Sequence, residues 1–116
     1  MRKETDIKTV HDLAEYYLHS PQFLALRSRT QKDYEYVISK VMATPIRLNK
    51  GLGDIKVDKV TVADCKTAYQ QWLVRGIRTA NMAATISSLL FNLAEEFELI
   101  SRNPMRSIKK LQTQPR

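Results

Sequence analysis

The segment from Arg75 to Phe97 reads R-G-I-R-T-A-N-M-A-A-T-I-S-S-L-L-F-N-L-A-E-E-F. Its large apolar residues recur at intervals of three and four, the spacing that places side chains on one face of an α-helix. We therefore expect a helix from Thr79 to about Phe97, with the Thr79 side chain as its cap. The buried stripe of this helix is expected to consist of Met82, Ile86, Leu89, Leu90, Leu93 and Phe97.

The start of this predicted helix is strongly basic. No acidic residue occurs between Asp64 and Glu95, whereas Lys66, Arg75 and Arg78 all fall within that interval. A helix N-terminus also exposes backbone N–H groups that lack partners inside the helix and favour a negatively charged ligand. The segment therefore predicts an anionic partner for this end of the helix.

A stripe of small, uncharged polar side chains follows the basic start. It consists of Asn81, Thr85, Ser88 and Asn92, at spacings of four, three and four residues. A helix with such an edge can approach a duplex closely and place hydroxyl and amide groups near phosphates or base edges. The alternative is a polar helix face in contact with water, and the stripe taken alone favours that alternative.

Two earlier helices carry clear start signals. Thr9 and Asp12, like Thr61 and Asp64, have the spacing of a capping box, in which each residue bonds the other's backbone at a helix start. Gly76 is expected to end the helix that begins at Thr61, because glycine readily takes a left-handed conformation. We expect an all-α fold of four main helices, over residues 9–19, 28–44, 61–75 and 79–97, with a loop over 46–60 and a short helical turn near Met105 and Ile108. The inner faces of the second and third helices are expected to carry Tyr34, Val37, Ile38, Val41 and Met42, and Val62, Cys65, Tyr69, Trp72 and Leu73.

The helix expected over residues 28–44 also begins among basic residues. Arg27, Arg29 and Lys32 surround Ser28, which is the predicted cap. Two basic helix starts could enter neighbouring grooves of one duplex, although the alternative that both sets contact only water stays open. The candidate DNA-binding residues are Arg27, Arg29, Lys32, Arg75, Arg78, Thr79, Asn81 and Thr85.

The composition is consistent with a nucleic-acid partner. The chain of 116 residues has the length of one domain, and its formal net charge is +7 at pH 7. Such an excess of positive charge attracts polyanions, of which nucleic acid is the commonest inside a cell. The basic residues are not spread along an amphipathic helix as a membrane-surface protein requires. Because neither a signal peptide nor an apolar run of about 20 residues is visible, we expect a cytoplasmic protein with no membrane partner.

No catalytic or metal-binding pattern stands out. His11 and His19 lack the i, i+4 spacing of a metal-binding helix, and the segment 51–53, G-L-G, lacks the third glycine of a phosphate-binding loop. Cys65 lies on the predicted inner face of its helix, where an inert core thiol is the ordinary outcome. We therefore expect no catalytic residue, no cofactor and no metal in this chain.

A series of short motifs occurs along the chain in a characteristic order. It consists of Thr30-x-x-x-Tyr34, Val60-Thr61-x-x-Asp64, Tyr69-x-x-Trp72-Leu73, Arg78-Thr79-x-Asn81, Leu90-Phe91-x-x-Ala94 and Ile100-x-x-Asn103-Pro104. In this order and spacing, residues 9 to about 110 resemble the core-binding domain of phage-integrase-type tyrosine recombinases. The final Ile-x-x-Asn-Pro element is the most telling, since no single motif in the series is specific.

The resemblance implies a compact SAM-like orthogonal bundle that forms one half of a clamp around duplex DNA, used in DNA integration and recombination. We expect the core-binding domain over residues 9–110, a disordered segment over 1–8 and the start of a linker over 111–116. In the family the catalytic residues belong to a separate C-terminal domain, so this chain is expected not to be an enzyme. The implied partners are double-stranded DNA, that catalytic domain of the same polypeptide and other recombinase protomers in a synaptic complex. The alternative is a helical protein-interaction module whose basic surface docks an acidic protein.

The resemblance also carries over the positions that face DNA in the family. They correspond to Arg29 and Lys32 in the second helix and to Thr79, Asn81 and Thr85 in the fourth. The chain departs from the family at Asp33, where an amide or a basic residue often faces the DNA. An acidic side chain there is expected either to lower affinity for DNA or to be turned aside by Arg29.

Overall fold

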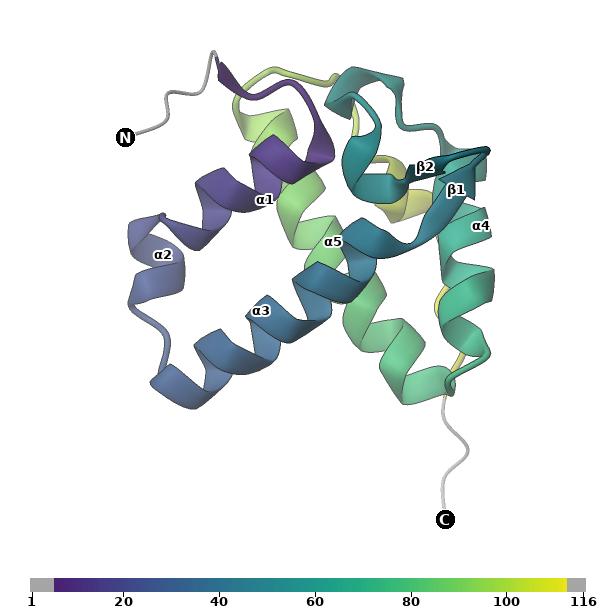
Figure 1. Cartoon of the computed structure of the whole chain (residues 1–116), viewed down its shortest axis with the longest axis horizontal. Helices are drawn as coiled ribbons and strands as arrows, with labels where there is room; N and C mark the ends of the chain where they lie inside the picture. The colour runs from purple at the N-terminus through teal and green to yellow at the C-terminus, as the bar shows by residue number, and fades with distance from the viewer. Residues whose placement is uncertain (1–5, 113–116) are drawn as a thin grey trace.

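The computed structural model describes residues 6–112, in which helices predominate (Figure 1). The mainly α-helical fold expected from the sequence is therefore confirmed. The helices are α1 (Val10–Leu18), α2 (Pro21–Leu24), α3 (Ser28–Ala43), α4 (Val62–Leu73) and α5 (Ile77–Glu96). Between α3 and α4 lie a small antiparallel hairpin, β1 (Pro45–Arg47) and β2 (Lys50–Gly51), and the 3-10 turns η2 (Leu52–Asp54) and η3 (Val57–Lys59); the turn η4 (Pro104–Ser107) follows α5.

Both predicted capping boxes are present. The Thr9 hydroxyl accepts a hydrogen bond from the Asp12 backbone N–H at 3.2 Å, and the Asp12 carboxylate accepts one from the Thr9 N–H at 3.1 Å. Thr61 and Asp64 make the same reciprocal pair at the start of α4, with both distances at 3.0 Å. These local hydrogen bonds fix where α1 and α4 begin, because they satisfy backbone donors that the helix itself leaves unpaired.

One helix of the structure was not expected. Ser20 caps α2 by accepting a hydrogen bond from the Phe23 N–H at 3.2 Å, and Pro21 occupies the first helical position, where its missing N–H costs nothing. Phe23 is buried and packs edge-on against Tyr17 of α1. The single turn of α2 thus anchors the corner between α1 and α3.

The predicted caps of α3 and α5 are each misplaced. The N-cap of α3 is Arg27 rather than Ser28, and no side chain caps that end. The helix α5 begins at Ile77, two residues before Thr79, with Gly76 at its N-cap and a φ of +116°. An L side chain rarely adopts that φ, so glycine makes the tight α4–α5 connection possible.

The helix α5 forms the centre of the bundle, where it contacts α1, α3 and α4 (Figure 1). The inner face of α5 is built mostly from small residues, and the predicted stripe of large residues is only partly buried. Met82 is 38% exposed, whereas Ile86 and Leu90 are buried as expected. The buried residues of α5 are Ala80, Ala83, Ala84, Ile86, Ser87, Leu90, Phe91 and Ala94, and the half-buried Leu89, Leu93 and Phe97 cover its edges.

The expected inner faces of α3 and α4 are largely confirmed. Ile38, Val41 and Met42 of α3 are buried, as are Cys65, Tyr69 and Trp72 of α4. Tyr34, Val37 and Leu73 are half-buried. Val62 is 36% exposed because it lies in the first turn of α4, before the helix meets the core, so its prediction as a core residue is wrong.

The segment between α3 and α4 is ordered by contacts with both neighbours. The Arg47 guanidinium donates to the Asp64 carboxylate at 2.7 Å, and Gln71 of α4 donates to the Pro45 carbonyl oxygen. Burial alone would raise the pKa of Asp64, but the hydrogen bonds from Arg47 and Thr61 outweigh that effect and lower it. The hairpin is therefore fastened to the start of α4.

The N-terminal boundary of the domain differs from the prediction. Ile7 is buried in the core and the Lys8 carbonyl oxygen accepts a hydrogen bond from the Val57 N–H at 2.8 Å, so the predicted disordered segment 1–8 is wrong at these residues. Residues 1–5, and residues 113–116 of the predicted linker, lie outside the described part of the chain. Within residues 6–112, no helix combines the length and the apolar character needed to cross a membrane.

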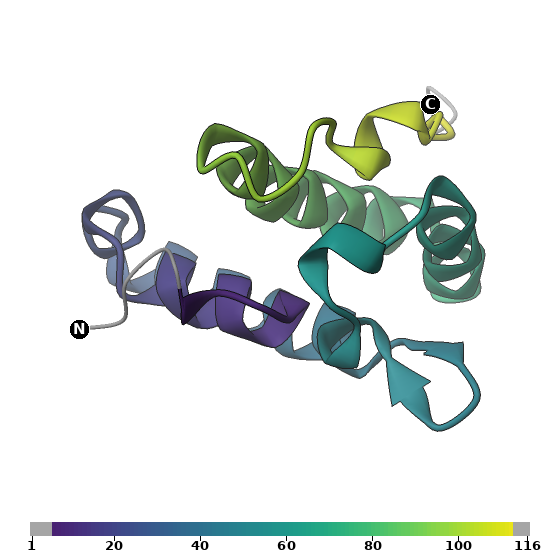
Figure 2. The ribbon, with the colours of Figure 1, turned by 90° about the horizontal axis from the view of Figure 1, so that it is seen from above.

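After α5 the chain folds back along that helix. Figure 2 shows this segment running along α5 on the side away from α1 and α3. Asn103 is fully buried, and its Nδ2 donates to the Ser88 carbonyl oxygen at 2.9 Å and to Asn92 Oδ1 at 2.7 Å. The Ile-x-x-Asn-Pro element thus fastens the C-terminal segment to the polar stripe of α5.

Candidate nucleic-acid interface

The two basic helix starts lie at opposite corners of one side of the molecule. In Figure 1 the N-terminal ends of α3 and α5 both point to the lower edge, while the two helices approach each other above it. The predicted basic residues at both starts are exposed, and neither helix has an acidic residue in its first turn. The exposed predicted residues are Arg27, Arg29, Lys32, Arg75, Arg78, Thr79 and Thr85.

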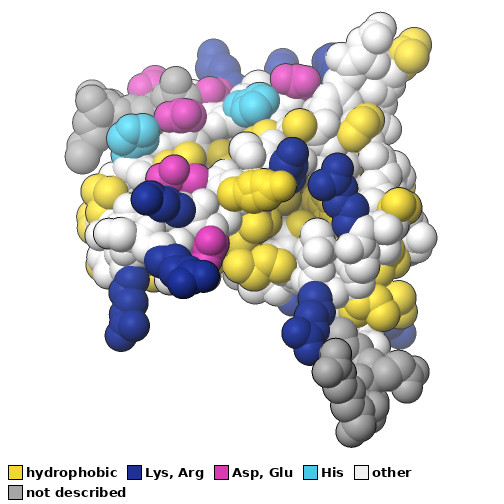
Figure 3. Space-filling view, turned by 60° about the horizontal axis from the view of Figure 1, so that its bottom comes forward, with side chains coloured by type: hydrophobic (Ala, Val, Ile, Leu, Met, Phe, Trp, Pro, Cys, Tyr) yellow, Lys and Arg dark blue, Asp and Glu magenta, His cyan; other side chains and the backbone are white. Residues whose placement is uncertain are grey.

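A groove of about 1000 Å³ separates the second half of α3 from the α4–α5 connection. Lys40, Arg75 and Arg78 supply its basic groups, and no Asp or Glu is among the residues that line it. Tyr36, which is 55% exposed, and Met82 provide apolar surface in its wall. Figure 3 shows a hollowed face on which exposed hydrophobic side chains are flanked by Lys and Arg side chains, with Asp and Glu side chains also beside them on one side.

Tyr36 and Lys40 were not predicted as site residues. The Lys40 ammonium nitrogen lies 5.4 Å from the centroid of the Tyr36 ring, within the range of a cation–π interaction. Arg29, Asp33, Tyr36 and Lys40 follow one another at spacings of four, three and four residues, so they share one exposed face of α3. That spacing was visible in the sequence, but it points to the groove only when α5 is known to lie opposite α3.

Asn81 and Thr85 have a different environment from the other predicted residues. Asn81 Oδ1 accepts a hydrogen bond from the Tyr69 hydroxyl at 2.7 Å, and Asn81 Nδ2 donates to the Leu111 carbonyl oxygen at 2.8 Å. The Thr85 hydroxyl accepts a hydrogen bond from Lys110 Nζ at 2.7 Å. The structure therefore places both residues against the C-terminal segment, although Thr85 stays exposed, and both ends of the Asn81 amide are engaged within the protein.

The rest of the polar stripe serves the same segment. Arg106 donates to Glu95 at 2.7 Å and to Asn92 Oδ1 at 3.0 Å. The hydrogen bonds from Arg106 and from the Asn103 N–H lower the pKa of the Glu95 carboxyl. Sequence reasoning missed this role of α5, because the bonded partners are 8 to 14 residues apart.

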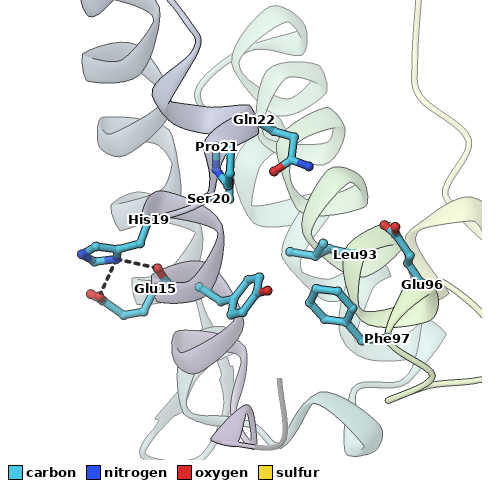
Figure 4. A pocket seen from close by; sticks show the side chains of 9 residues that line it. Glu15, His19, Ser20, Pro21, Gln22, Leu93, Glu96 and Phe97 are labelled. Carbon is cyan, nitrogen blue, oxygen red and sulfur yellow. Dashed lines mark hydrogen bonds and ion pairs between the residues drawn. The ribbon is translucent and has the colours of Figure 1, made fainter. Parts of the chain in front are cut away.

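A second hollow, of about 610 Å³, lies between α1, α2 and the end of α5 (Figure 4). Tyr16 and Phe97 meet edge to face within it, with ring centroids 5.1 Å apart. Its charged rim includes Glu15 and Glu96, and Glu15 pairs with His19 at 3.7 Å. This hollow is therefore acidic where the groove between α3 and α5 is basic.

Cys65 and Gly53, which were considered for chemistry, lie outside the linings of both hollows. Burial, with a smaller contribution from Asp64, raises the pKa of the Cys65 thiol to about 12, so the thiol stays protonated at neutral pH. A Cβ at Gly53 would lie 2.6 Å from Nε2 of His11, so glycine here makes room for the imidazole ring. Among residues 6–112, no group of three or more His, Cys, Asp and Glu side chains is placed to hold a metal ion.

The groove thus offers charge and shape for an extended anion. Arginine presents a planar fork of donors that suits phosphate oxygens, and the exposed ring and thioether of the groove suit sugars or base edges. Comparisons with protein-family models, with curated proteins and with solved structures found no match for this chain.

Proposed function

We propose that this chain binds double-stranded DNA as the core-binding half of a tyrosine-recombinase clamp that acts in DNA integration and recombination. One observation carries the proposal: the groove between α3 and the α4–α5 connection is lined by Lys40, Arg75 and Arg78 and by no acidic residue. The resemblance of residues 9–110 to the core-binding domain of that family supports the same assignment.

In this proposal affinity comes mainly from contacts with phosphates. The basic start of α3 carries Arg27, Arg29 and Lys32, and the start of α5 carries Arg75 and Arg78, so the two ends reach separate stretches of backbone. Neutralising phosphates releases counterions, which gives steep salt dependence and little intrinsic sequence preference. Groove residues such as Tyr36 and Met82 are the candidates for contacts with sugars and bases.

The chain binds and positions DNA in this scheme, and strand cleavage belongs to a catalytic domain elsewhere in the same polypeptide. Other recombinase protomers complete the synaptic complex. The buried, protonated Cys65 is unsuited to act as a nucleophile, which is consistent with a binding role.

A salt titration of binding to a duplex tests the proposal. Six phosphate contacts would give a slope of log K against log salt near about −5. Arg78→Glu should weaken binding to any duplex by about tenfold or more at 0.1 M salt, because it replaces a phosphate ligand with a repelling charge. Lys56→Glu is the matched control, since it makes the same change of charge at an exposed residue outside the groove lining.

A flat salt dependence, or equal binding by the Arg78 and Lys56 variants, would contradict the proposal. The second candidate is docking of an acidic protein, which the exposed apolar surface of Tyr36 and Met82 in the basic groove favours. That alternative predicts capture of an acidic amphipathic peptide, with loss on Arg78→Glu, and no binding to duplex DNA at 0.15 M salt.

A further inference from the structure

The last described residues form a clip with α4 and α5. The Tyr69 hydroxyl donates to Asn81 Oδ1 at 2.7 Å and accepts from the Leu111 backbone N–H at 2.8 Å. Asn81 Nδ2 closes the ring of hydrogen bonds by donating to the Leu111 carbonyl oxygen at 2.8 Å. Tyr69 and Asn81 are therefore bonded to each other and to the backbone N–H and C=O of Leu111.

The clip holds the last described residues at one corner of the bundle. In Figure 1 the yellow end of the described chain reaches the lower corner where α4 gives way to α5. Just before it, Lys110 Nζ donates to the Thr85 hydroxyl at 2.7 Å, and Lys109 is exposed. Thr85 and Arg78 are seven residues apart, so they share one face of α5. Lys110 thus lies on the side of α5 that continues the basic helix start, and the exposed Lys109 directly precedes it in the chain.

We propose that Tyr69 and Asn81 are positioning residues that fix the exit of the polypeptide, and that their clip adds Lys109 and Lys110 to the DNA-binding surface. The inference rests on the proposed function. A segment that is already ordered contributes its charges without losing backbone freedom on binding, whereas a free segment loses about 1–2 kcal/mol per residue that becomes ordered. The clip therefore raises affinity without touching the DNA.

The Tyr69 hydroxyl can be removed without disturbing the core. The Tyr69 ring is buried, and Tyr69→Phe keeps that packing while removing the donor to Asn81 and the acceptor for Leu111. Leu111→Pro opens the clip from the other side, because it removes the N–H at a residue that is half exposed. The matched control is Tyr16→Phe, which loses a hydroxyl from a ring packed on Phe97. Phe97 lies about 24 Å from Asn81 along the axis of α5.

The first measurement is made on the whole chain without DNA. Trypsin cleavage of the Lys109–Lys110 bond, followed by mass spectrometry, reports how often this segment leaves the bundle. Tyr69→Phe and Leu111→Pro should speed cleavage about tenfold, and Tyr16→Phe should leave it unchanged. Equal cleavage rates in all these proteins would overturn the clip.

The second measurement is affinity for a labelled duplex at 0.1 M salt, by fluorescence anisotropy. Tyr69→Phe should weaken binding about threefold to tenfold although it changes no charge. Lys109→Gln with Lys110→Gln should also weaken binding and reduce the salt slope by up to about 1.8. Adding Tyr69→Phe to this pair should produce little further loss, because the clip acts through the two lysines.

The two measurements separate failure of this inference from failure of the proposed function. Faster cleavage with unchanged affinity would show that the lysines do not join the interface, and would overturn that part of the proposal. If the unaltered chain does not bind the duplex at all, the DNA-binding function and the role of the lysines both fail. Faster cleavage in the two clip variants would still support the fixed exit at Leu111.

Discussion

The Trp72 indole N–H donates a hydrogen bond of 2.8 Å to the Thr44 hydroxyl oxygen. Trp72 lies near the end of α4, and Thr44 is the C-cap of α3, so this bond joins the two sides of the groove. The Thr44 hydroxyl in turn donates to the Lys40 carbonyl oxygen at 2.9 Å. Both side chains are buried, so the hydroxyl has no water to replace either partner.

Thr44→Val should lower the free energy of unfolding by about 1–3 kcal/mol, because the buried indole N–H would lose its acceptor. Urea unfolding followed by Trp72 fluorescence measures this change. Thr44→Ser retains the hydroxyl and should cost less than the valine. Equal stability of the valine variant and the unaltered protein would show that the hydrogen bond contributes nothing net.

Gly51, the N-cap of η2, and Gly53, within η2, should differ in their tolerance of an added methyl group. A Cβ at Gly51 would lie 2.8 Å from the Met42 carbonyl oxygen, whereas the atoms nearest to a Cβ at Gly53 belong to the His11 side chain. His11 is exposed and can rotate away, but the Met42 backbone is fixed at the end of α3. Gly51→Ala should therefore cost about 1–3 kcal/mol and Gly53→Ala about 1 kcal/mol or less, by thermal unfolding. The reverse order would contradict the steric argument.

Asp33 is the acidic member of the exposed face of α3 that also carries Arg29 and Lys40. Asp33→Asn removes a charge that repels phosphate and should tighten binding to duplex DNA about twofold to fivefold at 0.1 M salt. Asp58→Asn makes the same change in η3 and should leave affinity nearly unaltered. Equal gains from both variants would indicate an effect of net charge alone, with no special position for Asp33.

The Asp64 carboxylate should make stability depend on pH in the acid range. Its pKa in the folded state is lowered from the ordinary value of 3.8, so the ionised form stabilises the fold. That contribution is fully present above the unfolded-state pKa and is lost as the pH falls through the folded-state pKa. At pH 7, Asp64→Asn should lower the free energy of unfolding by about 1–3 kcal/mol through loss of the Arg47 and Thr61 bonds. Urea unfolding at pH 7 and at pH 3 should show this difference shrinking, and a difference that stays constant would exclude the proposed linkage.

The sequence was sufficient where the determinants are local. The capping boxes at Thr9 and Thr61 need only residues three positions apart, so the starts of α1 and α4 could be predicted. The cap of α5 could not, because Gly76 permits an earlier start through its backbone conformation alone. The start of α2 was also missed, since its signal of Ser20 followed by proline governs only one turn.

The composition of the core depended on distances that the sequence does not contain. Its hydrophobicity favoured Met82 as a core residue, but Met82 is exposed. Ala83 and Ala84 are buried where α5 packs against its neighbouring helices. Small side chains allow helices to approach closely, which leaves larger residues at the rim. The candidate site shows the same division: the basic helix starts were visible, whereas the pairing of Asn81 with Leu111 joins residues 30 positions apart.

The burial of Cys65 has a practical consequence for experiments on this protein. Burial raises the pKa of the Cys65 thiol to about 12, so the thiol stays protonated at pH 7, and the sulfur is shielded from solvent. A cysteine introduced at the exposed Gln112 should therefore react with a maleimide dye while the native thiol stays unmodified. Single-site fluorescent labelling of this protein should therefore not require replacement of Cys65.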